Sequence, residues 1–176
     1  MKFVITGGPG AGKSTVIKLL SDKGYKTVSE IARKVIKSNL KKKNNALPWK
    51  DWLGFQREVC DKQLRIEEKL PKNKIVFLDR GYLDGLAYLK LHGEKPFDKL
   101  LSIRPDYAKV FLLEPLGDFK TDECRKEDKK TALKLHNLIK KAYSGYEIVK
   151  VPNVSPEERV DLILKNLSER VKAKTF

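Results

Sequence analysis

The sequence has few cysteines and no long hydrophobic run, and both shortages exclude whole classes of protein. Among its 176 residues are two cysteines, Cys60 and Cys124, which lie far apart and lack the spacing of metal ligands. We therefore expect reduced thiols rather than a disulfide framework or a zinc site. No apolar run approaches the roughly 20 residues that a membrane-spanning helix needs, so we expect a protein that is not transmembrane.

The N-terminus leaves little room for a leader peptide. Its first residues, MKFVITGG, form an expected buried strand that leads directly into a glycine-rich loop. A secretory signal would need a longer apolar segment and a cleavage site there. Together with the reduced cysteines, this start predicts a cytoplasmic protein.

Acidic residues are scarce relative to basic ones. The chain has 23 aspartates and glutamates against 38 lysines and arginines, which gives a formal net charge of +15. Such a surface attracts polyanions, including nucleotides, nucleic acids and acidic lipid headgroups. No helix-turn-helix, zinc-finger or aromatic RNA-binding pattern accompanies the charge, so we do not expect nucleic acid to be the main partner. An acidic lipid surface stays open as a partner, as does a purely solubilising role.

Short apolar runs alternate with longer helical patterns, which predicts a single α/β domain, residues 1–176, with a parallel sheet between layers of helices. The expected strands lie within residues 2–6, 25–29, 74–81, 108–114 and 146–151. Helices are expected from residues 13, 30, 51 to 70, near 82, around 135–142 and from 156, where Ser155 and Glu158 can form a capping box. Residues 41–49, KKKNNALPW, predict an exposed and mobile linker.

A phosphate-binding loop pattern lies between the first strand and the first helix. The segment contains Gly7-x-x-x-x-Gly12-Lys13-Ser14. Backbone N–H groups of such a loop surround phosphate oxygens, its lysine contacts the β- and γ-phosphates, and its hydroxyl binds Mg²⁺. We predict ATP or GTP with Mg²⁺ as the ligand, bound by Gly8, Pro9, Gly10, Ala11, Gly12, Lys13, Ser14 and Thr15.

An acidic residue and an arginine end the most apolar run, VFLDRG. A carboxylate at this place can hold Mg²⁺ directly or through water, which makes Ser14 and Asp79 the predicted metal site. Asp79 could instead cap the helix expected near Tyr82. Arg80 follows at once, and an acid–arginine pair here is typical of small nucleoside and nucleotide kinases. Arg80 is therefore a candidate ligand for a phosphate or for the acceptor.

Two further segments predict where a second substrate binds. Glu30 and Arg33 follow the second strand, at the sheet edge where open α/β folds bind ligands. Glu30 is a candidate base for an acceptor hydroxyl and Arg33 a candidate clamp; a surface glutamate at a helix start is the alternative. Gln56 and Gln63 lie seven residues apart on one helix face. Gln56 is a candidate reader of a base or ribose, and a solvent-exposed polar face is the alternative.

A basic segment, DECRKED, follows the fourth strand. Small kinases carry a lid at this place that closes over the phosphates and brings positive charge to the transferred group. We predict a lid at approximately residues 117–131, with Arg125 as its catalytic arginine. A solvated charged helix face is the alternative. The two histidines, His92 and His136, are isolated in the sequence, and we assign them no function.

In combination, these motifs resemble one family, the small AAA-type ATPase-like P-loop proteins that include the nicotinamide riboside kinase domain and the TRP-channel translocation proteins. The resemblance spans nearly the whole chain and rests on FVITGGPGAGKST, SEIARKVI, LPWKDWLGFQREVCDKQ, FLDRGYLDGLAYLKLHG and KTDECRKED, in this order. It implies a P-loop kinase-like fold with a five-stranded parallel sheet in the order 2-3-1-4-5. It also implies Gly12, Lys13, Ser14 and Thr15 as nucleotide ligands, Asp79 as the acid beside Mg²⁺ and Arg125 as a lid arginine.

These expectations favour a phosphotransferase that moves the γ-phosphoryl group of ATP or GTP to a hydroxyl of a small acceptor, either a nucleoside or a nucleotide. Lys13 and Arg125 would stabilise the transferred group, and Glu30 or Asp79 would handle the proton. Two alternatives stay open. One is a nucleotide-dependent switch or NTPase that docks on acidic lipid or a protein partner, and the other is an NTPase that serves nucleic acid.

Overall fold

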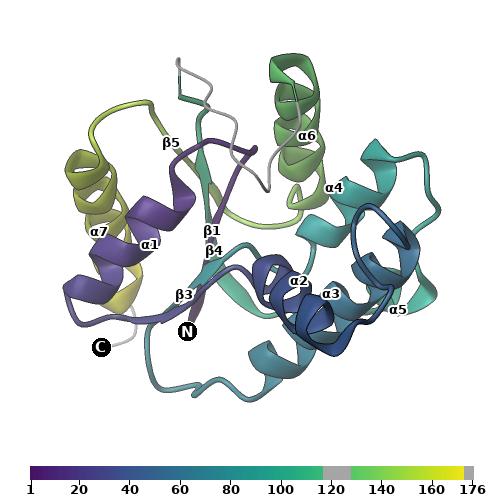
Figure 1. Cartoon of the computed structure of the whole chain (residues 1–176). Helices are drawn as coiled ribbons and strands as arrows, with labels where there is room; N and C mark the ends of the chain where they lie inside the picture. The colour runs from purple at the N-terminus through teal and green to yellow at the C-terminus, as the bar shows by residue number, and fades with distance from the viewer. Residues whose placement is uncertain (117–127, 173–176) are drawn as a thin grey trace.

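A parallel sheet of five strands forms the centre of the molecule (Figure 1). The structure, a computed structural model, describes residues 1–116 and 128–172, the side chains of the last five excepted. The strands are β1 (Lys2–Thr6), β2 (Lys26–Val28), β3 (Val76–Asp79), β4 (Tyr107–Leu113) and β5 (Ile148–Val151). They pair in the order β2-β3-β1-β4-β5, and every pair is parallel. The expected fold class and strand order are confirmed.

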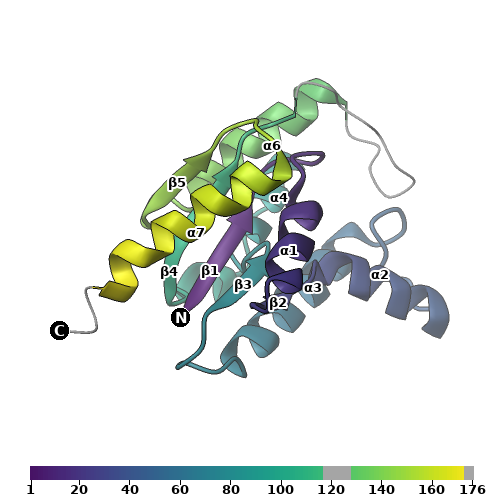
Figure 2. The ribbon, with the colours of Figure 1, turned by 90° about the vertical axis from the view of Figure 1, so that its left-hand side faces the viewer.

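Helices cover both faces of this sheet and give three layers (Figures 1 and 2). On one face lie α1 (Lys13–Asp22) and α7 (Pro156–Lys172), which pack against each other. The other face is covered by α2 (Ile31–Lys42), α3 (Trp52–Glu68), α4 (Asp84–Leu91), α5 (Asp98–Ser102) and α6 (Lys129–Ala142). Within residues 1–116 and 128–172, no helix is long and apolar enough to cross a membrane.

The central strands are apolar on both sides because helices cover both sides. Phe3 and Ile5 of β1 pack with α1 and α7, whereas Val4 between them packs with the helices of the other face. All three side chains are fully buried. Alternate residues of a strand point to opposite faces, so a strand covered on both faces needs an unbroken apolar run. This requirement explains the runs FVI and VFL in the sequence.

Three local features test the sequence expectations. Ser155 and Glu158 form the expected capping box, with Ser155 N donating to Glu158 Oε2 (3.0 Å) and Glu158 N to Ser155 Oγ (3.2 Å). The linker after α2 is not exposed throughout, because Leu47 is buried and Asn39 Nδ2 donates to the Ala46 carbonyl (2.8 Å). The five-residue helix α5 was not expected, since so short a helix shows no clear periodicity.

The carboxyl ends of the strands meet at one edge of the sheet. Ile5 pairs with Asp79 on β3, and Thr6 pairs with Leu112 on β4. The glycine-rich loop after β1, the DRG segment after β3 and the start of α2 after β2 therefore come together. In open parallel sheets this edge is where ligands bind.

Candidate active site

The loop between β1 and α1 is tightly turned, and its shape depends on glycine. Gly7, Gly10 and Gly12 have φ angles of 141°, 72° and 80°, which residues with a side chain rarely adopt. A Cβ atom on Gly7 would lie 2.6 Å from the Leu113 carbonyl oxygen. The loop therefore packs directly on the end of β4. Backbone N–H groups of such a loop, with the N-terminus of α1, form an anion-binding site.

Lys13 projects from α1 back into this loop. Its side chain is buried, and its Nζ donates to the carbonyl oxygens of Gly7 (3.2 Å) and Gly8 (2.7 Å). The ammonium group is thus held inside the loop by two of its carbonyl oxygens. Of the other predicted nucleotide ligands, Gly8, Pro9 and Ala11 are buried, Gly10 and Gly12 are half-buried, and Ser14 and Thr15 are exposed on the first turn of α1.

Asp79, at the end of β3, faces the first turn of α1. Ser14 Oγ donates to Asp79 Oδ2 over 3.3 Å. The other oxygen, Oδ1, is buried and has no hydrogen-bond partner among the described residues. Burial raises the pKa of Asp79, although the charges of Lys13 and Arg80 act in the opposite direction. Asp79 does not cap the helix that the sequence predicts near Tyr82. This helix, α4, begins only at Asp84, and Asp79 lies too far upstream to cap it.

The Ser14 and Asp79 oxygens fit a small hard cation. Mg²⁺ prefers oxygen ligands and usually keeps waters and phosphate oxygens in its shell, with one or two carboxylates from the protein. The unpartnered Asp79 Oδ1 is an oxygen of this kind. No group of three or more histidine, cysteine or acidic side chains that could hold a metal occurs in the described part of the chain. The residues thus fit a Mg²⁺ ion that is shared with a nucleotide.

Arg80 has an unusual backbone and a fully engaged side chain. Its φ of 70° lies in the left-handed region, although it is not glycine. The Nε group donates to Glu30 Oε1 (3.2 Å), and one terminal nitrogen donates to the Gly7 carbonyl (3.4 Å). The guanidinium also lies 5.3 Å from the centre of the Tyr88 ring. Arg80 therefore joins the phosphate loop to the start of α2.

Glu30 is ionised and held between two arginines. Its carboxylate accepts from Arg80 and also from Arg33 Nε (2.9 Å). Burial alone would raise the pKa of Glu30, but the charges of Arg80 and Lys13 and the hydrogen bond from Arg33 outweigh it and lower the pKa to about 2. Its side chain is only 13% exposed. Glu30 does lie at the start of α2, as its N-cap residue, but it is not a solvent-exposed surface glutamate.

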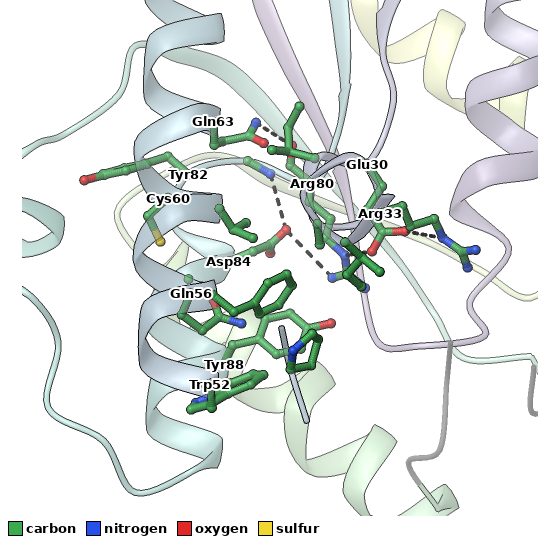
Figure 3. Close-up of a pocket in the computed structure, with 18 of the residues that line it drawn as sticks. Glu30, Arg33, Trp52, Gln56, Cys60, Gln63, Arg80, Tyr82, Asp84 and Tyr88 are labelled. Carbon is green, nitrogen blue, oxygen red and sulfur yellow. Dashed lines mark hydrogen bonds and ion pairs between the residues drawn. The ribbon is translucent and has the colours of Figure 1, made fainter. Parts of the chain in front are cut away.

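A cavity opens beside Glu30 and Arg80, between α2, α3 and α4 (Figure 3). The cavity volume is about 140 Å³, which is below the range of most small-molecule sites, so a ligand of nucleoside size would have to widen it. Most of the wall is apolar or aromatic and includes Ile31, Ile36, Trp52, Phe55, Val59 and Tyr88. Gln56 extends from α3 into this wall and is 4% exposed. The alternative of a solvent-exposed glutamine face is wrong.

Asp84 is a residue of this site that the sequence analysis missed. It lines the cavity and is buried. Its carboxylate accepts from Thr6 Oγ1 (2.7 Å) and from Gly81 N (3.3 Å) and lies 3.9 Å from Arg80. Burial raises the pKa of Asp84, and Arg80 and Thr6 oppose this effect. A single acid four residues after Arg80, in the otherwise apolar stretch YLDGLAYL, was the signal that could have found it.

Two other residues lie at this site, although neither was a candidate site residue. Gln63 lines the cavity, but its amide is engaged within the protein, because Nε2 donates to Glu67 Oε1 (2.8 Å) and to the Arg80 carbonyl (3.3 Å). His136 of α6, which we gave no function, is buried against the phosphate loop with Nδ1 3.5 Å from Gly8 N.

The predicted lid is mostly outside the described residues, and Arg125 lies outside them. The described part of this segment begins at Asp128, which caps α6 by accepting from Thr131 N (2.7 Å).

Comparison with known proteins agrees with this geometry. A sequence model described as an AAA domain matches residues 2–159. The chain belongs to this family. No curated protein sequence matches the chain significantly.

Several solved structures are similar in fold. Thymidylate kinase from Ehrlichia chaffeensis has a TM-score of 0.67 at 17% identity, over 95% of this chain and 98% of that one. Deoxyadenosine kinase from M. mycoides, with dCMP and dCDP bound, gives 0.65 at 16% identity, over 96% and 99%. Shikimate kinase from Aquifex aeolicus gives 0.60 at 20% identity, over 97% and 98%. This AAA domain therefore has a P-loop kinase fold.

Proposed function

We propose that this AAA domain is a kinase that transfers the γ-phosphoryl group of ATP or GTP to a hydroxyl of a nucleoside. One observation carries the proposal: the phosphate loop, which would bind the donor, adjoins the apolar cavity, which would bind the acceptor. Pro9 of the phosphate loop, Glu30 and Arg80 all line the apolar cavity. A protein that only hydrolyses its nucleotide needs no such cavity beside the γ-phosphate position. The proposal keeps the cytoplasmic location that the sequence predicts.

The donor half of the site is the loop with its buried lysine. Loop N–H groups and the start of α1 would bind the phosphates, and Lys13 would contact the β- and γ-phosphates. Ser14 and Asp79 would hold Mg²⁺, which supplies positive charge to the phosphate oxygens. Arg125 is the candidate for a further cation over the transferred group, as the sequence predicts.

In the transfer itself, the acceptor oxygen forms a new bond to the γ-phosphorus while the bond to the β–γ bridging oxygen breaks. The nucleoside diphosphate leaves, and the hydroxyl proton must be accepted. The Glu30 carboxylate is the candidate to receive a hydrogen bond from this hydroxyl. Its pKa of about 2 makes it a weak base, so we assign it the orientation of the hydroxyl, with the proton passing to water late in the reaction. Catalysis then rests on positioning and charge.

The chemistry of the cavity favours a nucleoside over a nucleotide. Aromatic and aliphatic walls suit a flat heterocycle, and the Gln56 amide offers one acceptor and one donor group for its polar edge. The two arginines that line the cavity, Arg33 and Arg80, already bind Glu30. A phosphate on the acceptor would have to compete with that carboxylate. Of the similar proteins, deoxyadenosine kinase is named for a nucleoside and thymidylate kinase for a nucleoside monophosphate, so together they support an acceptor with a base and a sugar and do not choose between the two.

The proposal is tested by product analysis. The protein is incubated with ATP or GTP, Mg²⁺ and a panel of nucleosides, nucleoside monophosphates and shikimate, and the products are identified by mass spectrometry. We expect a nucleoside to gain one phosphate. The Gln56→Leu variant should lower this yield, whereas Arg65→Ala, an exposed site on the same helix, should not. Tight nucleotide binding with no phosphorylated acceptor would overturn the proposal.

A second candidate function has one observation in its favour. At the end of α2, Leu40 and nearby Trp49 are 54% and 62% exposed, and Lys41, Lys42 and Lys43 are exposed beside them in the sequence. Basic residues with exposed apolar side chains favour binding to anionic membranes. A nucleotide-dependent switch on acidic lipid would bind phosphatidylserine vesicles and not phosphatidylcholine vesicles, with affinity that depends on the bound nucleotide. Vesicle sedimentation separates the two functions.

A further inference from the structure

The turn after β3, residues 80–82, forms hydrogen bonds with side chains of α3 and β4, outside the phosphate loop. We propose that Gln63, Glu67 and Tyr107 are positioning residues that fix the left-handed turn at Arg80 and thereby orient its guanidinium between Glu30 and the loop. This inference rests on the proposed function in one respect: the orientation of Arg80 affects phosphoryl transfer only if the protein is a kinase. We call these three residues the clamp, and their hydrogen bonds are present in the protein without substrate.

The clamp is a closed set of buried hydrogen bonds around one oxygen. Glu67 Oε1 accepts from Gln63 Nε2 (2.8 Å), from Tyr107 OH (2.9 Å) and from Tyr82 N (3.2 Å). Tyr82 N also donates to Tyr107 OH (2.7 Å), and Gln63 Nε2 also donates to the Arg80 carbonyl (3.3 Å). The Arg80 end of the turn is therefore bound to α3, and the Tyr82 end to both α3 and β4.

The turn needs such support because its backbone is strained. The φ of Arg80, 70°, brings its Cβ close to its own carbonyl group. Conformations of this kind persist only where the surroundings over-determine them, and they concentrate at functional sites. Space behind the turn is also closed, since a Cβ on Gly81 would lie 2.7 Å from Tyr143 OH and 2.8 Å from Tyr107 OH. The two tyrosine hydroxyls thus occupy the space that a side chain at residue 81 would need.

The carboxyl group of Glu67 is buried at a free-energy cost that an apolar side chain would not have. It is 3% exposed, and its Oε2 is buried without a hydrogen-bond partner among the described residues. Burying a carboxyl group in an apolar interior costs free energy even when it is partly hydrogen-bonded, and burial raises the pKa of Glu67 here. A leucine would fill such a core site without that cost, but it would leave Tyr82 N and Tyr107 OH with fewer partners.

The guanidinium depends on this turn because the backbone sets its direction. With φ in the left-handed region, the side chain reaches both Glu30 Oε1 and the Gly7 carbonyl. Relaxation of Arg80 to the ordinary helical or extended region would swing its Cα–Cβ bond away from both. Gln63 also lines the acceptor cavity, so the clamp and the cavity wall share the same face of α3.

The test reads the Arg80 side chain directly, by NMR of the whole chain labelled with ¹⁵N and without any substrate. The Nε–Hε signal of Arg80 is assigned by its absence in Arg80→Lys. We expect this signal to shift or disappear in Glu67→Ala and in Tyr107→Phe, and to return to its wild-type position in Glu67→Gln, whose Oε1 can accept the same hydrogen bonds. Tyr146→Phe is the matched control, because that hydroxyl donates to the Pro105 carbonyl, away from the turn.

Several outcomes are distinguishable. An unchanged Arg80 signal in Tyr107→Phe and in any folded Glu67→Ala would overturn the clamp, whatever the activity. If Glu67→Ala does not fold, Tyr107→Phe decides alone. Once an acceptor is known, kcat should fall roughly 10- to 100-fold in Tyr107→Phe with the KM for ATP nearly constant, because small misplacement of a reacting group has effects of about that size. If the wild type phosphorylates no acceptor, the proposed function fails, and the NMR result still decides the clamp.

Discussion

Arg80 and Glu30 lie 50 residues apart in sequence and form an ion pair of 3.2 Å at the floor of the candidate site. Their side chains are 9% and 13% exposed, so the pair is largely protected from water. Attraction between such charges is stronger than at the surface, and the loss of either partner leaves an uncompensated charge. Because Arg80 also donates to the Gly7 carbonyl, the pair connects the apolar cavity to the phosphate loop.

Replacement of Lys13 should strongly weaken nucleotide binding. Its ammonium group lies buried inside the loop, where it would contact two phosphates. A hydrogen bond to a charged group is worth about 1.5–3 kcal/mol, so we expect Lys13→Ala to weaken ATP binding by about 100-fold in titration calorimetry. Lys18→Ala, one turn further along α1 and paired with Asp22, should bind like the wild type. Equal affinity in Lys13→Ala would contradict the assignment of the loop.

Replacement of Asp79 should act through the metal ion. Asp79→Asn keeps the shape of the side chain but removes the charge that favours Mg²⁺. We expect a higher Mg²⁺ concentration at half-maximal activity, with activity partly restored by excess Mg²⁺. Asp22→Asn, an exposed position on α1, is the control. An unchanged Mg²⁺ dependence would show that Asp79 is not near the ion.

Glu30 should make stability depend on pH in acid solution. Its pKa is lowered from 4.5 to about 2 in the folded protein, so its charge stabilises the fold above pH 4.5, and this contribution is lost as the pH falls toward 2. The full effect is on the order of 3 kcal/mol. Urea unfolding of the wild type and Glu30→Gln should give free energies that differ at pH 6 and converge near pH 2. A difference that is constant with pH would contradict the ion-pair assignment.

Gln56 should govern acceptor binding and not donor binding. Gln56→Leu keeps the volume of the side chain and removes its amide, so a polar edge of the acceptor would lose its partners. A lost hydrogen bond of this kind is worth about 1 kcal/mol or more, and we expect the acceptor KM to rise roughly tenfold while the KM for ATP stays constant. Steady-state kinetics measures both. A rise in the KM for ATP alone would move Gln56 out of the acceptor site.

The sequence predicted the position of the phosphate loop and of Asp79 better than the surroundings of the cavity residues. The phosphate loop is a contiguous pattern between a strand and a helix, so local spacing was enough to place it. The position of Asp79 followed from the apolar strand before it. Both are properties of short segments, and the sheet order was implied by the family resemblance.

The contacts between distant segments could not be predicted. Glu30 and Arg80 were each singled out, but their pairing depends on β2 and β3 being neighbours in the sheet. The bond from Thr6 to Asp84 joins residues 78 apart, and no local pattern marks it. Gln56 is a polar residue on a helix, and such residues are mostly exposed. Only the packing of α3 against α2 and α4 shows that it faces a cavity.

The most direct test of the kinase proposal follows the γ-phosphoryl group itself. ATP labelled in the γ-phosphate is mixed with the protein, Mg²⁺ and the nucleoside that product analysis identifies, and the reaction is quenched at intervals. The proposal predicts that the label appears in the nucleoside and that little inorganic phosphate forms. Label that appears only as inorganic phosphate, at the same rate with and without the nucleoside, would contradict it.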